Sequence, residues 1–163
     1  MTTGNCGEAR DGSCHRYRPW QARGRYPFGG SDVTSTAEQA IRRKVGRMSA
    51  MLAARDMAIV DELWSPGFRL VGSEQGEIAE DRDGLARLFT MLFARPVSYA
   101  FDFRRFDLAA QSGVAWLFAE GDLVASAADG ATRHPYRLTA VFTGGGEDWT
   151  WRLFSGSEPA PHA

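Results

Sequence analysis

Hydrophobic residues first recur along the chain with the spacing of a helix. Ser35 begins the string Ser-Thr-Ala-Glu, a capping box in which the Glu38 carboxylate lies three residues after the hydroxyl. The apolar residues that follow at helical spacing are Ile41, Val45, Met48 and Leu52. This pattern predicts a helix over residues 35–55. Asp56 can cap a short second helix that ends at the Ser-Pro-Gly string of residues 65–67.

A hairpin and a third helix are expected next. Residues 68–71 and 77–79 read as two short strands joined by a glycine-containing turn. Either Asp81 or Asp83 can cap the helix that follows, and Pro96 ends it. The apolar residues on its inner side are Leu85, Leu88, Phe89, Leu92 and Phe93.

From residue 98 onward the apolar positions alternate, which is typical of strands. The alternation slips once: the aromatic set Tyr99, Phe101 and Phe103 is odd-numbered, whereas the next set, Phe106 and Leu108, is even-numbered. One extra residue at Arg104-Arg105 would keep both sets on one face, which is the effect of a β-bulge. Further alternating strands are expected over residues 114–124, 134–142 and 149–157.

Helices in the first half and long antiparallel strands in the second predict an α+β domain. We expect three helices packed on a strongly curved, mostly antiparallel sheet around an apolar pocket, because a bulged meander curves readily. The domain is expected over residues 34–159. Residues 1–33, rich in glycine and without apolar period, are expected to be a disordered or loosely docked tail, and residues 160–163 a C-terminal tail.

Composition and charge narrow the function classes. The 163 residues carry a net charge of −1, so no basic excess calls for nucleic acid or an anionic membrane. No apolar run reaches the roughly 18 residues of a spanning helix, and no secretory leader is visible, so we expect a cytoplasmic protein. Cys6, Cys14 and His15 are too few for the usual four-ligand zinc site, and no metal or cofactor is expected.

The order of elements, together with three groups of local strings, resembles the SnoaL-like branch of the nuclear transport factor 2-like superfamily. These strings are residues 52–56 with 63–68, residues 81–85, and residues 136–139 with 149–152 and 155–159. The resemblance implies a cone-shaped fold and a homodimer formed through the outer sheet face. It also implies a pocket for a small apolar or aromatic molecule, which in some members is the site of an isomerase, cyclase or hydrolase.

The polar residues of the ketosteroid-isomerase branch are missing from this sequence. The resemblance places the branch's aspartate base near Gly72 and its tyrosine donor near Met48, and neither residue can do that work. Glu74 lies close to the first position. A histidine that many members carry corresponds to Ser155 here, and the domain's own His134 is either a catalytic group or an exposed residue at a strand start.

Carboxylates on the strands are the remaining catalytic candidates. Glu120 and Asp122 are two residues apart and so share a strand face with Trp116 and Phe118. If this face lines the pocket, the carboxylates would be desolvated and could act as general acid or base. The alternative is that they meet water and pair with arginines on the next strand, Arg137 or Arg133. Two further acid–arginine pairs flank the bulge, Asp102 with Arg104 and Arg105 with Asp107; they form either a water-activating cluster or outward-facing ion pairs.

The expected pocket residues are mostly aromatic, and each of these aromatic residues can equally belong to the core. They are Trp64, Phe68, Trp116, Phe118, Tyr136, Arg137 and Trp151. Arg137 and Arg152 would face either a ligand carboxylate or a dimer surface. The sequence thus predicts a small-ligand-binding domain, with a non-catalytic dimeric binding or assembly module as the alternative.

Overall fold

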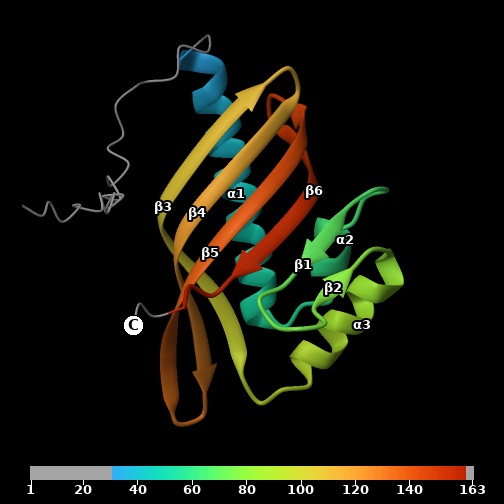
Figure 1. The fold of residues 1–163 in the computed structure, drawn as a ribbon, viewed down its shortest axis with the longest axis vertical. Helices are drawn as coiled ribbons and strands as arrows, with labels where there is room; N and C mark the ends of the chain where they lie inside the picture. Colours follow the sequence, from blue (N-terminus) through green and yellow to red (C-terminus); the bar gives the residue numbers. More distant parts are fainter. Residues whose placement is uncertain (1–30, 161–163) are drawn as a thin grey trace, which may run out of the picture.

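The computed structural model describes residues 31–160, and the side chains of residues 36–160. Three helices precede or interrupt the strands: α1 (Ser31–Ala54), α2 (Ile59–Leu63) and α3 (Arg82–Phe93). The strands are β1 (Arg69–Val71), β2 (Ile78–Ala79), β3 (Ser98–Gln111), β4 (Val114–Ala127), β5 (Gly130–Gly145) and β6 (Asp148–Ser157). Figure 1 shows α1 lying across one face of a strongly twisted sheet, with α3 and the β1–β2 pair beside its C-terminal end. The predicted α+β fold is confirmed.

Helix α1 begins earlier than the sequence predicts. Ser35 and the rest of the expected capping box lie inside the helix, which starts at Ser31. Glu38 accordingly does not cap the helix; its carboxylate lies 2.8 Å from the Arg42 guanidinium, one turn on. Residues 31–33, assigned above to the tail, are helical. Residues 1–30 and 161–163, with Cys6, Cys14 and His15, lie outside the described residues.

Two aspartates shape the shorter helices. The Asp81 side chain accepts a hydrogen bond from the Gly84 N–H at 2.6 Å, so Asp81 rather than Asp83 caps α3. Asp56 accepts from the Ala58 N–H at 2.9 Å and fixes the turn that leads into α2. No helix in residues 31–160 has the length and apolar content needed to cross a membrane.

The six strands form one sheet in the order β2-β1-β6-β5-β4-β3, and only β1 and β6 run parallel. The predicted bulge in β3 is confirmed: Phe103 pairs with Gly121 and Arg105 with Glu120, which leaves Arg104 as the extra residue. Gly121 makes this geometry possible, because a Cβ there would lie 2.1 Å from the Asp102 carbonyl oxygen. The bulge bends the sheet around α1.

A second bulge, which the sequence did not reveal, lies in β6. Val141 pairs with Leu153 and Phe142 with Trp151, so Arg152 is the unpaired residue. Its guanidinium donates to the Thr143 hydroxyl at 2.7 Å and reaches the carbonyl of Pro66 at 2.8 Å. The bulged residue thereby ties the loop between α2 and β1 to the sheet.

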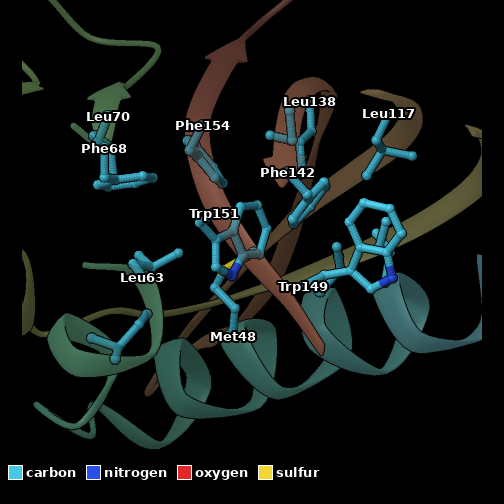
Figure 2. Close-up of a cluster of buried hydrophobic side chains, with 14 of the residues drawn as sticks. Met48, Leu63, Phe68, Leu70, Leu117, Leu138, Phe142, Trp149, Trp151 and Phe154 are labelled. Atoms are coloured by element: carbon cyan, nitrogen blue, oxygen red, sulfur yellow. The ribbon is translucent and has the colours of Figure 1, made fainter. Parts of the chain in front are cut away.

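The core lies between α1 and the concave face of the sheet. Trp151 is fully buried, and its ring centroid is 4.4 Å from that of Phe142 and 6.3 Å from that of Phe154. Figure 2 shows this ring above Met48 of α1. Burying a large apolar side chain contributes roughly 1.5–3 kcal/mol, which holds α1 against the sheet. The Trp151 Nε1 atom has no hydrogen-bond partner in the described part of the chain.

Candidate ligand-binding cavity

A cavity of about 370 Å³ opens where the C-terminal end of α1, helix α3 and the strands β3 to β5 meet. This volume lies within the roughly 300–1,000 Å³ of small-molecule sites. Most of its lining is apolar. Helices contribute Met48, Leu52, Leu63, Leu88, Phe89 and Leu92, and the sheet contributes Leu70, Phe101, Leu123, Ala125 and Phe154.

Tyr136 of β5 brings a hydroxyl into this apolar lining. The residue is 4% exposed, and its ring centroid lies 5.0 Å from that of Phe101. Gly156 leaves the space for the hydroxyl, since a Cβ at that position would lie 1.7 Å from the oxygen. Burial raises the pKa of Tyr136 well above its usual value, and the charges of Glu77 and Glu158 raise it further. The phenol therefore stays protonated and can donate a hydrogen bond at neutral pH.

Glu77 brings a carboxylate to the cavity from the turn between β1 and β2. Its side chain lies against Gly72, where an added Cβ would be 2.1 Å from the Glu77 Oε2 atom. The same oxygen accepts a hydrogen bond from the Glu74 N–H at 3.1 Å, and the Gly72 N–H donates to the Glu77 carbonyl at 2.6 Å. Gly72, directly after β1, thus makes room for the carboxylate of Glu77, directly before β2.

Three chain segments meet at the rim of the cavity. Arg95, after α3, binds both carboxylate oxygens of Glu74 at 3.3 and 3.2 Å. Hydrogen bonds to Glu74 and Tyr99 raise the pKa of Arg95, which is charged in any case. The Ser73 hydroxyl donates to Glu158, which follows β6, at 3.2 Å. The β1–β2 turn is therefore fastened to the end of α3 on one side and to the chain after β6 on the other.

The two positions that the resemblance assigns to a tyrosine and an aspartate, Met48 and Gly72, both line the cavity. Met48 supplies only an apolar surface there. Glu74, two residues after Gly72, is bound by Arg95. Ser155 pairs with Val71 of β1 in the sheet and does not line the cavity.

His134 lies at the exposed edge of the cavity. Its side chain is exposed, and its Nε2 atom is 3.1 Å from the Thr132 hydroxyl on the same strand. Of the two alternatives left by the sequence, this placement corresponds to the exposed histidine.

Glu120 and Asp122 lie on the outer, convex face of the sheet and not in the cavity. They share this face with Trp116, as expected, but Trp116 is 47% exposed, whereas the alternate residues Leu117 and Ala119 are buried. The expectation that these carboxylates line the pocket is therefore corrected, although Asp122 is itself only 8% exposed. The inner positions of β4 between residues 115 and 121 carry small or aliphatic side chains because the strand packs closely in the core.

Arginines engage both outer carboxylates. Arg137 donates to Glu120 at 3.0 Å, while Arg104 and Arg133 donate to Asp122 at 2.6 and 2.8 Å. The hydrogen bond from Arg104, followed by that from Arg133, lowers the pKa of Asp122 to about 2. A carboxylate held ionised in this way is poorly suited to general acid or base catalysis near neutral pH.

The acid–arginine pairs around the bulge also face outward. Of the two expected pairs, Arg105 with Asp107 forms, at 2.5 Å. The expected pair of Asp102 with Arg104 is wrong: Asp102 pairs with Arg133, and Arg104 binds Asp122. The side chains of the Arg105–Asp107 and Arg133–Asp102 pairs are about half exposed. They form ion pairs on the outer face, which is the plainer of the two alternatives that the sequence left open.

The predicted pocket residues lie in three places: the core, the outer face of the sheet and the cavity lining. Phe68 and Trp151 are fully buried in the core, and Trp64 packs edge-on against Phe68 at 6.4 Å. On the outer face, Trp116, Phe118 and Arg137 lie away from the cavity, and the Arg105 guanidinium covers the Phe118 ring at 5.4 Å. Within the described residues, Tyr136 is the member of the predicted set that lines the cavity.

Sequence reasoning missed Glu77, Glu158 and Ser73. Gly72 and Gly156 were the available signals, because a lone glycine at the end of a strand or within it often marks a close approach by another group.

A family model for the SnoaL-like domain matches residues 41–161. The chain belongs to the SnoaL-like family. Solved structures of the nuclear transport factor 2-like superfamily share its fold. A Streptomyces avermitilis protein superposes with a TM-score of 0.67 at 10% identity, covering 78% of this chain and 99% of its own. A Salmonella enterica protein gives 0.66 at 15% identity, covering 80% and 96%.

A third similar structure comes from Catenulispora acidiphila and is in complex with S-DNPA. It has a TM-score of 0.66 and 13% identity, and the match covers 76% of this chain and 94% of that one. At these identities the likeness shows the fold alone. None of the curated protein sequences matches the chain.

Proposed function

We propose that this SnoaL-like domain binds a small, mostly apolar molecule in the cavity between α1, α3 and the sheet. The observation that carries the proposal is an apolar cavity of about 370 Å³ whose lining includes the buried Tyr136. Ligand sites commonly combine such a lining with a few convergent polar groups. The complex of the Catenulispora protein with S-DNPA supports a binding role for this fold.

Any reaction at this site would draw on the polar groups of the cavity. Tyr136 offers a hydrogen-bond donor and Glu77 an acceptor at the same lining. An isomerase, cyclase or hydrolase acting on an apolar substrate would use such a donor and acceptor in preference to Glu120 and Asp122, which lie on the outer face.

A pair of neighbouring substitutions tests the binding role. Leu123 lines the cavity, whereas Val124, the next residue of β4, does not. Leu123→Trp should fill the cavity and weaken binding of a neutral aromatic probe, 1-naphthylmethanol, at least tenfold by titration calorimetry. Val124→Trp should leave that affinity within about twofold. Equal affinities for the two variants, both folded by circular dichroism, would contradict the proposal.

The outer sheet face supports a second role, as a homodimerisation surface. Trp116 and Val114 are exposed there by 47% and 39%, beside arginine–carboxylate pairs that a second copy could complement. We propose that the chain forms a homodimer through this face, as a dimeric binding or assembly module would. Sedimentation should give a dimer at micromolar concentration that Trp116→Glu converts to a monomer; a wild-type monomer would refute the dimer.

A further inference from the structure

We infer that the cavity selects a ligand that carries a protonated amine on an apolar or aromatic body. This inference rests on the proposed binding function and adds the charge of the ligand to it.

The rim of the cavity carries more negative than positive charge. Among the described residues, its lining contains the carboxylates of Glu74, Glu77 and Glu158, the guanidinium of Arg95 and the imidazole of His134. Arg95 binds both oxygens of Glu74 and so neutralises that carboxylate. Glu77 and Glu158 have no cationic partner among residues 36–160. Two negative charges at the cavity are therefore left for a ligand to neutralise.

The two carboxylates are held in place by neutral donors. Glu77 accepts a hydrogen bond from the Glu74 N–H and fills the space beside Gly72, while Glu158 accepts from the Ser73 hydroxyl. Neutral donors orient a carboxylate without cancelling its charge, so both groups remain attractive to a cation. Both carboxylates lie at the same end of the cavity, because Glu77 lies against Gly72 and Glu158 accepts from Ser73, the next residue of the chain.

Aromatic side chains line the same region. Tyr99, Phe101 and Tyr136 all contribute to the lining, and the rings of Phe101 and Tyr136 lie 5.0 Å apart. Aromatic faces attract cations, and this attraction strengthens when the cation is desolvated. An ammonium group at the rim would meet carboxylate oxygens and ring faces, while its apolar body would lie against Leu88 and Leu123.

The structure also argues against a ligand carboxylate. Arg137 and Arg152, which the sequence offered for an anion, are engaged elsewhere: Arg137 binds Glu120 on the outer face, and Arg152 binds Thr143 and the Pro66 carbonyl. A carboxylate in the cavity would meet Glu77 and Glu158, and Arg95 is already paired with Glu74. These two carboxylates would repel a ligand of the same charge.

Three probes of matched shape test the inference: 1-naphthylmethylamine, 1-naphthylmethanol and 1-naphthoate. Titration calorimetry on the full chain at pH 7 and low salt should give an amine affinity about tenfold above that of the alcohol, with the carboxylate weakest. The preference should shrink as salt is raised, because the rim is partly solvent-exposed. An alcohol or carboxylate that binds as tightly as the amine would overturn the inference.

Variants assign the preference to the two carboxylates. Glu77→Gln with Glu158→Gln keeps the side-chain shapes and leaves one acceptor oxygen on each side chain, and should reduce the amine-to-alcohol preference to about twofold. Glu80→Gln is the matched control: Glu80 lies on the same hairpin, faces solvent and pairs with Arg69, and its change should leave the preference intact. A preference that survives in the double variant would refute the assignment.

The outcomes separate this inference from the proposed function. If the alcohol binds but the amine has no advantage, the cavity binds ligands and the charge selectivity fails. If none of the three probes binds, the binding role of the cavity fails, and the inference with it.

Discussion

The carboxylates of the convex face are bound by arginines, whereas, within residues 36–160, two of the three carboxylates at the cavity rim are not. On the convex face, Asp122 is held by two arginines and Glu120 by a third. At the rim of the concave face, Glu77 and Glu158 are held by neutral donors. A carboxylate that already has an arginine partner gains little from a ligand, whereas an unpaired one can still bind a cation. Pairing, more than residue type, therefore separates the structural carboxylates from the candidate functional ones.

The largest expected difference between the faces is in stability. Leu138 is fully buried on the concave face and Thr139, the next residue of β5, is exposed on the convex face. Leu138→Ala should lower the free energy of unfolding by about 2–5 kcal/mol, because it leaves a cavity in the core. Thr139→Ala should change it by less than about 0.5 kcal/mol. Urea unfolding at one protein concentration measures both, and similar losses would mean that the faces are assigned incorrectly.

A smaller loss of stability is expected from a substitution at Gly156, which lies against the Tyr136 hydroxyl. Gly156→Ala would place a Cβ 1.7 Å from that oxygen and should destabilise the fold by roughly 1–3 kcal/mol. Tyr136→Phe removes the oxygen and should partly rescue the alanine variant. The rescue should be incomplete, since the ring carbon that carries the hydroxyl would still lie 2.6 Å from the Cβ. A double-mutant cycle with no coupling would contradict this packing.

The smallest expected effect is the pH dependence of the convex ion pairs. The pKa of Asp122 is lowered to about 2 in the fold, so the stabilisation it provides is present above the ordinary aspartate value of about 3.9 and is lost as the pH falls towards 2. Asp122→Asn should therefore reduce the fall in melting temperature between pH 4 and pH 2.

Asp129→Asn provides the control for this pH effect. Asp129 lies in the exposed turn between β4 and β5 and forms no ion pair within the described residues. The control should keep the wild-type acid profile. If Asp122→Asn also keeps it, the arginines do not stabilise the ionised Asp122.

The alternation of apolar and polar residues along the strands was predictable from sequence. Which of the two alternating sets of side chains faces the core was not. The slip at Arg104 predicts the bulge correctly, because one extra residue lets an alternating strand change phase while its apolar side chains stay on the same face. In β4 the larger side chains, Trp116 and Phe118, lie on the convex face, while Leu117 and Ala119 pack inside. Alternation alone makes the larger set look internal, and only the packing of the helices shows otherwise.

The polar groups of the cavity could not be predicted from the sequence, for a related reason. Glu77, Glu158 and Tyr136 come from the β1–β2 turn, the chain after β6 and the middle of β5, and only the sheet order brings them together. Nothing in their spacing along the chain marks them as neighbours. The glycines that accommodate them, Gly72 and Gly156, are the local trace of this arrangement.

The most direct test of the central claim, that the concave cavity is the working site, is to locate a bound probe. Intermolecular nuclear Overhauser effects from the ring protons of 1-naphthylmethylamine should reach the methyl groups of Leu88, Leu92 and Leu123, which line the cavity. Contacts to the methyl groups of Val114 on the convex face, without any to these leucines, would contradict the account.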